Sequence, residues 1–209
     1  MASTRPASSA TPATEAGSRF HSARALTEAL AEPLSEADAT IQSMDDASPA
    51  KWHLAHVTWF WETFLLRDHA PEYTLFDVKW PFLFNSYYEA EGERHARARR
   101  GMITRPSLAE VLDYRAHVTD AMETLLGRED LSGLIELGIA HEQQHQELLL
   151  TDIKHALFQN PLGPAMWGGA PEKSPAHSRD WQTHPGGIAM IGHEGPGLAG
   201  NSGDASAAG

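Results

Sequence analysis

The stretch "LSGLIELGIAHEQQHQELLLTDIKHALF" (131–158) decides the fold. Its apolar residues recur every three or four positions, as they do along one face of an α-helix. The segment "QNPLGP" (159–164) follows, and its asparagine, prolines and glycine are residues at which helices end. The stretch therefore predicts one long helix with an apolar side, which other helices must cover.

Three further segments have a helical pattern, at 19–41, 51–69 and 106–126. Pro33 interrupts the first segment. Ser48 and Pro49 precede the second, as a capping side chain followed by proline at a helix start. Ser107 and Glu110 open the third at the spacing of a capping box. Together the segments predict an all-α four-helix bundle over residues 19–160.

The segments outside these helices have other compositions. Residues 1–18 are rich in Ala, Ser, Thr and Pro, and we expect a disordered tail because they have little to bury. Residues 70–106 lack periodicity and contain the basic run "RHARARRG" (94–101); a connection of this length is usually functional or disordered. Past residue 160 Gly, Pro, Ser and Ala dominate, which predicts a linker and an irregular tail over 161–209, where "HPGGIAMIGHEGPG" (184–197) could start a strand-rich element.

The net charge of −12 argues against binding to nucleic acid or to an anionic membrane, because both need a cationic face. No segment approaches the roughly 20 consecutive apolar residues of a membrane span, and the N-terminus lacks the apolar core of a secretory signal. We therefore expect a cytoplasmic protein. The chain has no cysteine, so imidazole and carboxylate groups must hold any metal.

His141, Glu142 and His145 have the HExxH order of a zinc protease helix. The extended protease motif needs a glycine and a histidine where this chain has Leu148 and Thr151, and no helical glutamate follows as a third ligand. The protease interpretation therefore fails, and Glu142 is expected to be an exposed acid.

His141 and His145 nevertheless share one helix face, since they are four residues apart, and can reach one metal. The alternative is a chance pair with one exposed histidine. Apolar neighbours favour an inward orientation; they are Leu134, Leu137, Gly138, Leu148 and Leu149.

In "WHLAH" (52–56), His56 has the more apolar surroundings, and His53 falls to its side by helix periodicity, so both should not reach one centre. His56 is either a third metal ligand or a buried histidine bonded to the backbone. Glu62 is a conceivable fourth group, although a solvated surface carboxylate is the simpler expectation.

Four motifs resemble, in order and at suitable intervals, the N-terminal half of the ergothioneine-biosynthesis sulfoxide synthases. They are "SPAKWHLAHVTWFWETFLL" (48–66), "FNSYYEAEGERHARARRG" (84–101), "RPSLAEVLDYRAHV" (105–118) and "HEQQHQELLLTDIKHALFQNPLGPAM" (141–166). The resemblance implies a DinB-like four-helix bundle with a three-histidine site for non-haem iron(II), Fe(II), whose ligands are His56, His141 and His145. It also implies an oxidoreductase that joins the thiol of gamma-glutamylcysteine, or of cysteine, to trimethylhistidine with dioxygen (O2), giving a sulfoxide.

The resemblance also implies substrate contacts. Gln144 matches a family glutamine that contacts trimethylhistidine; otherwise it is a helix-surface residue. The basic run could hold the carboxylates of the thiol substrate, because guanidinium groups pair with carboxylates; otherwise its arginines are solvated. They are Arg94, Arg97, Arg99 and Arg100.

Enzymes of that family continue into a second domain, which resembles the formylglycine-generating enzymes. "HPGGIAMIGHEG" (184–195) is similar to its opening, whereas "PGLAGNSGDASAAG" (196–209) is not. We therefore expect a truncated synthase, with little activity unless a separate C-terminal domain supplies the missing part. Two alternatives remain open: a stand-alone DinB-like thiol transferase that uses the triad with zinc or nickel, or a non-enzymatic bundle whose helices the metal staples together.

Overall fold

The computed structural model describes residues 12–169, 181 and 183–189. The chain divides into two compact units, Met1–Met166 and Trp167–Gly209. In the second unit the described residues form neither helix nor strand. The expected strand-rich element at 184–197 extends outside the described residues. Of the expected tail at 1–18, residues 1–11 also lie outside them, whereas the chain is already helical from Pro12, seven residues before the predicted start.

The first unit is helical, and its described residues contain no strand. Its elements are α1 (Pro12–Ala31), α2 (Glu36–Thr40), α3 (Ala50–Phe60), the π-helix η1 (Trp61–Arg67), α4 (Trp80–Phe84), the 3₁₀ helices η2 (Glu89–Glu91) and η3 (Arg97–Met102), α5 (Leu108–Met122), the 3₁₀ helix η4 (Glu129–Leu131) and α6 (Ser132–Gln159). The long helices α1, α3 with η1, α5 and α6 are the four that the sequence predicts, so the all-α prediction is confirmed.

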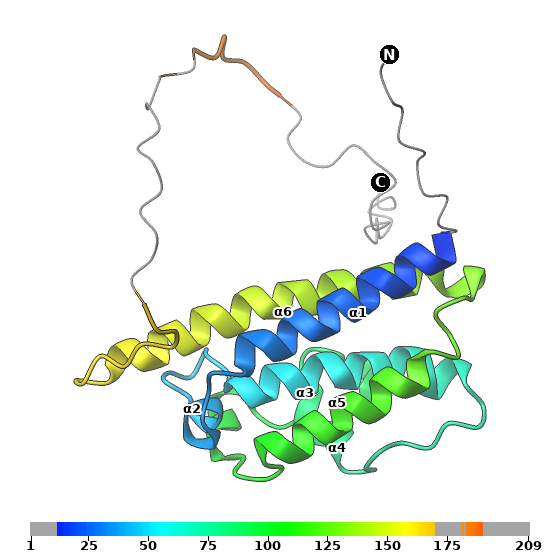
Figure 1. Cartoon of the computed structure of the whole chain (residues 1–209), viewed down its shortest axis with the longest axis horizontal. Helices are drawn as coiled ribbons and strands as arrows, with labels where there is room; N and C mark the ends of the chain where they lie inside the picture. Colours follow the sequence, from blue (N-terminus) through cyan, green and yellow to red (C-terminus); the bar gives the residue numbers. More distant parts are fainter. Residues whose placement is uncertain (1–11, 170–180, 182, 190–209) are drawn as a thin grey trace, which may run out of the picture. The chain divides into compact units, whose positions relative to one another are not determined.

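Helix α3 lies at the centre of the bundle, between α1, α5 and α6 (Figure 1). Every residue of α3 is buried, as expected for a helix that other helices surround. It continues without a break into η1, and the helical backbone ends at His69, as predicted. A π-helical turn widens the backbone and is frequent at functional sites; here it orients Trp61 and Glu62, both fully buried.

Helices α1 and α6 lie side by side and run in the same direction (Figure 1). Arg19 bonds to Glu136 near the start of both helices, and Thr27 bonds to Glu142 farther along. Helix α1 ends at Ala31, two residues before Pro33, which confirms the predicted break.

The two predicted helix caps have different outcomes. The Ser107–Glu110 capping box is present: Glu110 N–H donates to Ser107 Oγ at 3.2 Å, and Ser107 N–H donates to Glu110 Oε2 at 2.7 Å. The Ser48 cap was wrong. Helix α3 begins at Ala50 after Pro49, without a side-chain cap, because both polar groups of Ser48 have other partners near the histidines.

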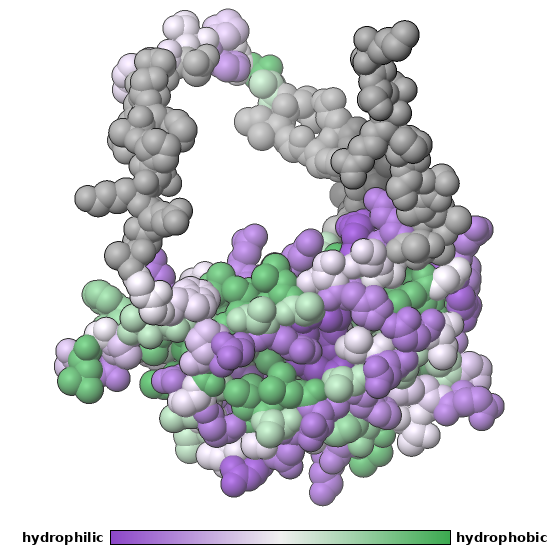
Figure 2. All heavy atoms as spheres, viewed as in Figure 1, coloured by the Kyte–Doolittle hydropathy of each residue, from purple (hydrophilic) through white to green (hydrophobic). Residues whose placement is uncertain are grey.

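The surface in Figure 2 is a mosaic in which hydrophilic residues predominate over α1, while hydrophobic residues gather at the C-terminal end of α6. There Phe158 is 83% exposed. None of the described helices combines the length and the apolar composition that crossing a membrane requires.

Candidate metal centre

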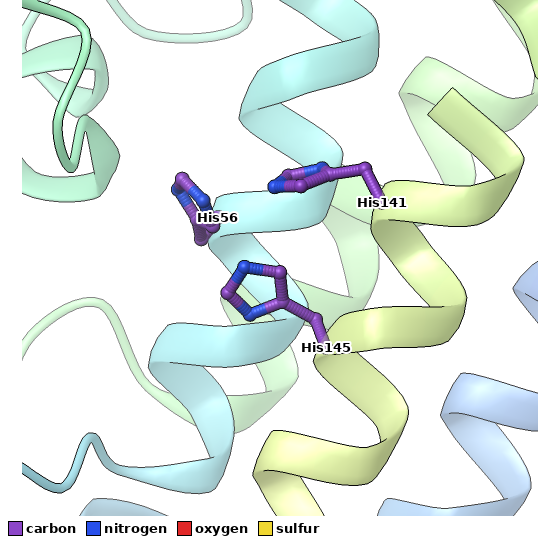
Figure 3. Close-up of side chains that lie close together, drawn as sticks. All are labelled: His56, His141 and His145. Carbon is purple, nitrogen blue, oxygen red and sulfur yellow. The ribbon is translucent and has the colours of Figure 1, made fainter. Parts of the chain in front are cut away.

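Helices α3 and α6 bring His56, His141 and His145 together (Figure 3). One ring nitrogen of each lies within 4.8 Å of the other two. The ring centroids are 5.0 Å apart for His56 and His141, 4.6 Å for His56 and His145, and 4.7 Å for His141 and His145. The three residues that the sequence selects therefore form one cluster that could hold a metal ion.

The ring of His56 is held from three sides. Its Nδ1 bonds to the carbonyl oxygen of Phe84 at 2.6 Å, and because a carbonyl only accepts, Nδ1 carries the proton. The ring stacks on Trp52, with centroids 4.5 Å apart, and faces Trp59 at 5.5 Å on its other side. The lone pair of His56 is consequently on Nε2.

His145 contacts a fourth histidine. Its Nδ1 lies 2.9 Å from Nδ1 of His53, whose Nε2 lies 3.0 Å from Asp152 Oδ2. The same carboxylate oxygen accepts the Ser48 N–H at 2.8 Å. His53 is outside the triad, as helix periodicity predicts, but it bonds directly to a member of it.

Burial keeps the cluster uncharged. It lowers the pKa of His56 well below the ordinary value, and the neighbouring His141 adds to this effect. It lowers the pKa of His141 to about 4, although the charge of Glu142 opposes the shift. The pKa of His145 is also lowered, by burial and then by His56 and His53. Metal ligation needs neutral imidazole, so near pH 7 the three lone pairs are available.

This donor set fits a divalent first-row metal, for which imidazole is a common ligand. Two of the rings have Nδ1 engaged in the protein, which leaves Nε2 for coordination. Nδ1 of His141 is buried without a hydrogen-bond partner among the described residues, so this ring is less firmly held.

A pocket of about 240 Å³ opens beside the cluster, and all three histidines line it. Arg100 also lines it and is 4% exposed. Its guanidinium carbon lies 3.3 Å from the centroid of the Trp52 ring, and its Nη atoms donate to Ser48 Oγ at 2.9 Å and Ser86 Oγ at 3.2 Å. Among the described residues no carboxylate pairs with this cation, and its buried Nε has no acceptor.

Burial and the nearby Arg97 lower the pKa of Arg100 to about 9, so the side chain is still cationic at neutral pH. A desolvated cation with neutral partners favours an anionic ligand.

The other predicted substrate residues divide into two groups. Gln144 and Arg97 line the pocket. Arg97 donates to the Tyr87 hydroxyl at 2.8 Å and to the Asp46 carbonyl oxygen. Arg94 does not line the pocket but lies 5.8 Å from the centroid of the Tyr87 ring. Arg99 is exposed and does not line it either.

The expectation that Glu142 is an exposed acid was wrong. Its carboxylate is fully buried and does not line the pocket; it points toward α1 and α5, where Oε1 bonds to Arg115 at 2.9 Å and to Thr27 at 2.8 Å. Oε2 accepts Trp61 Nε1–H at 2.8 Å and pairs with Arg24 at 3.3 Å. Burial alone would raise the pKa of Glu142, but the two arginines outweigh it and lower the pKa to about 2. A carboxylate held in this way cannot act as the general base of a protease.

The expectation that Glu62 is a solvated carboxylate was also wrong. Glu62 is fully buried, and Oε1 accepts the Tyr73 hydroxyl at 2.7 Å and the Phe76 N–H at 2.8 Å. Oε2 accepts the Tyr114 hydroxyl at 2.5 Å. Three neutral donors replace the water that the carboxylate would otherwise need, and the group is not part of the histidine cluster.

The apolar flank of the histidine pair is narrower than predicted. Gly138 and Leu149 are buried and Leu134 is partly buried, but Leu137 is 43% and Leu148 38% exposed. Leu148 lines the pocket instead of the core.

Sequence reasoning missed the roles of Ser48, His53 and Asp152. Asp152 follows His145 by seven residues, which is two helical turns and hence the same face, so this signal was present in the sequence. The contacts of Phe84 with His56 and of Ser86 with Arg100 had no such signal.

Two comparisons with known proteins bear on the family. A search of curated proteins finds no match. A family model described as the DinB superfamily matches residues 19–149. This range is more than half of the chain and contains all three histidines of the cluster. The fold and the match agree, and the chain belongs to the DinB superfamily.

Proposed function

We propose that this chain is the metal-binding part of a non-haem iron(II) sulfoxide synthase, which joins the thiol of gamma-glutamylcysteine or cysteine to trimethylhistidine with dioxygen. The observation that carries the proposal is the position of the triad: three neutral imidazoles line a pocket that also contains Arg100, a buried cation that no carboxylate of the described residues pairs with. A purely structural metal site has its coordination closed by protein ligands, whereas this cluster borders an open pocket.

The chain's own residues have separable roles in this proposal. Arg100 binds a carboxylate of the thiol substrate, and Arg97 at the same pocket adds a second donor group. Gln144 contacts the trimethylhistidine. Trp52 and Trp59 hold the His56 ring between them and exclude water from its two faces. When bound, iron would provide Lewis acidity and redox chemistry toward dioxygen.

The first test is anaerobic addition of iron(II) to the purified chain, with nitric oxide as a surrogate for dioxygen, followed by each substrate. We expect an iron–nitrosyl spectrum that changes on addition of trimethylhistidine or the thiol. His56→Ala, His141→Ala and His145→Ala should each abolish iron binding, and His117→Ala, an exposed histidine on α5, should not.

The outcomes separate the candidate functions. Iron binding that survives loss of His56 would refute the triad. Iron binding without a response to either substrate would favour the metal-stapled bundle. A thiol response with zinc or nickel but no response to trimethylhistidine would favour a thiol transferase. In Arg100→Met we expect at least a tenfold weaker response to the thiol and an unchanged response to trimethylhistidine.

A further inference from the structure

The bonds from His145 to His53 and from His53 to Asp152 form a continuous chain between a cluster histidine and a carboxylate. The donor in each bond follows from the chemistry of its acceptor. A carboxylate can only accept, so His53 Nε2 donates to Asp152 Oδ2 across 3.0 Å. That the same oxygen also accepts the Ser48 N–H at 2.8 Å agrees with this role.

The first assignment determines the second. A neutral imidazole has one N–H, and in His53 that proton is on Nε2. Nδ1 of His53 is therefore an acceptor, and Nδ1 of His145, 2.9 Å away, must be its donor. His53 is 3% exposed, and a buried imidazole favours the neutral form that the assignment needs.

We propose that His53 and Asp152 are positioning residues that fix His145 in its Nδ1–H tautomer, direct its Nε2 lone pair into the cluster and strengthen it as a ligand. Carboxylates behind a histidine ligand fix its tautomer and raise its basicity, and their loss typically weakens metal binding 10- to 100-fold. Here a second imidazole transmits the effect of the carboxylate. The affinity part of the inference rests on the proposed function, whereas the tautomer part does not.

The three histidines of the cluster differ in the hydrogen-bond partner of their Nδ1 atoms. His56 Nδ1 donates to a neutral carbonyl oxygen, His145 Nδ1 to a histidine backed by a carboxylate, and His141 Nδ1 to no partner among the described residues. His145 is therefore the member of the triad that a chain of hydrogen bonds connects to a carboxylate.

Asp152→Asn distinguishes the charge from the hydrogen bonds. Both Ser48 N–H and His53 Nε2–H donate to one carboxylate oxygen, so the amide oxygen of asparagine can accept both. We expect Asp152→Asn to keep the His145 tautomer and to lower cobalt(II) affinity about 10-fold. Asp152→Ala should lower it further, and His53→Phe, which removes the acceptor, should shift His145 toward the Nε2–H tautomer. Glu147→Gln removes one negative charge from an exposed position of the same helix and should change neither the His145 tautomer nor the cobalt(II) affinity.

The tautomer is read in the metal-free protein from the ring nitrogen shifts of ¹⁵N-labelled histidine, and affinity from titration with cobalt(II) under anaerobic conditions. Circular dichroism checks that each variant is folded. If Asp152→Ala and His53→Phe do not fold, Asp152→Asn still provides the test. An Nε2–H tautomer of His145 in the parent protein, or a tautomer unchanged in a folded His53→Phe variant, would overturn the inference. Equal cobalt(II) affinity in the parent and in Asp152→Asn would overturn the role of the charge. If the parent protein binds no metal but shows the expected tautomers, the proposed function would be refuted. The role of His53 and Asp152 in fixing the His145 tautomer would still hold.

Discussion

At the scale of single residues, Gly138 shows how closely α6 approaches the core. A Cβ atom at this position would lie 2.4 Å from Cη2 of Trp61, whose ring is fully buried and bonded to Glu142. We expect Gly138→Ala to lower the free energy of unfolding by about 1–3 kcal/mol, as overpacking in a rigid core does. Gly133→Ala, on the same helix with no atom within 4 Å of the added Cβ, should instead be neutral or stabilising by about 0.5–1 kcal/mol. Urea unfolding measures both, and equal stability of the two variants would contradict the proposed close packing.

The same scale shows where sequence information ends. The pair His141 and His145 was predictable because the two residues share a helix face, whereas for His56 the pattern left two interpretations open and the family resemblance indicated the ligand. The burial of Glu142 was not predictable, because it depends on pairing with Arg24 of α1 and Arg115 of α5. Ser48 resembles a helix cap in sequence, but its N–H and hydroxyl bond to Asp152 and Arg100, which are distant along the chain.

At the scale of elements, Glu142 ties α6 to α1 and α5. Removing one partner from a buried ion pair leaves the others uncompensated and typically costs about 3–5 kcal/mol. We expect Glu142→Gln to destabilise the protein by that amount, because Arg24 and Arg115 would remain buried without a carboxylate at their centre. Glu136→Gln breaks the exposed pair with Arg19 between the same two helices, α1 and α6, and should cost less than about 1 kcal/mol. Similar losses in the two variants would show that the buried network adds nothing beyond a surface pair.

The periodicity of the sequence predicted which helices form, but it did not predict which segments contact one another. The four long helices and the Ser107–Glu110 capping box are local features, and the structure contains them. Residues 70–106 lack periodicity, so their path through the structure could not be predicted. Their path places Ser86 and Arg100 at the pocket and Phe84 O against His56, through contacts between residues far apart in the chain.

At the scale of the whole molecule, the buried titratable groups make stability depend on pH in a defined direction. His141 has a pKa of about 4 in the folded chain against 6.5 for a free side chain. Between these values the unfolded state binds more protons than the folded state, so the free energy of unfolding falls as the pH falls. Each histidine of this kind contributes about 1.4 kcal/mol per pH unit within its window, and the lowered pKa values of His56 and His145 act in the same direction.

Glu142 extends the effect to lower pH. Its pKa of about 2 lies below the ordinary 4.5, so its contribution is complete above pH 4.5 and is lost as the pH falls toward 2. For the metal-free protein we therefore expect that these groups do not change the free energy of unfolding above about pH 6.5. Below that pH, the free energy of unfolding should decline continuously as the pH falls. Urea unfolding at half-unit pH steps measures the curve, and His141→Asn should make the slope between pH 6.5 and 4 shallower by about 1.4 kcal/mol per unit. A parent curve without slope in that interval would mean that the buried histidines take up protons in the folded state as readily as in the unfolded one.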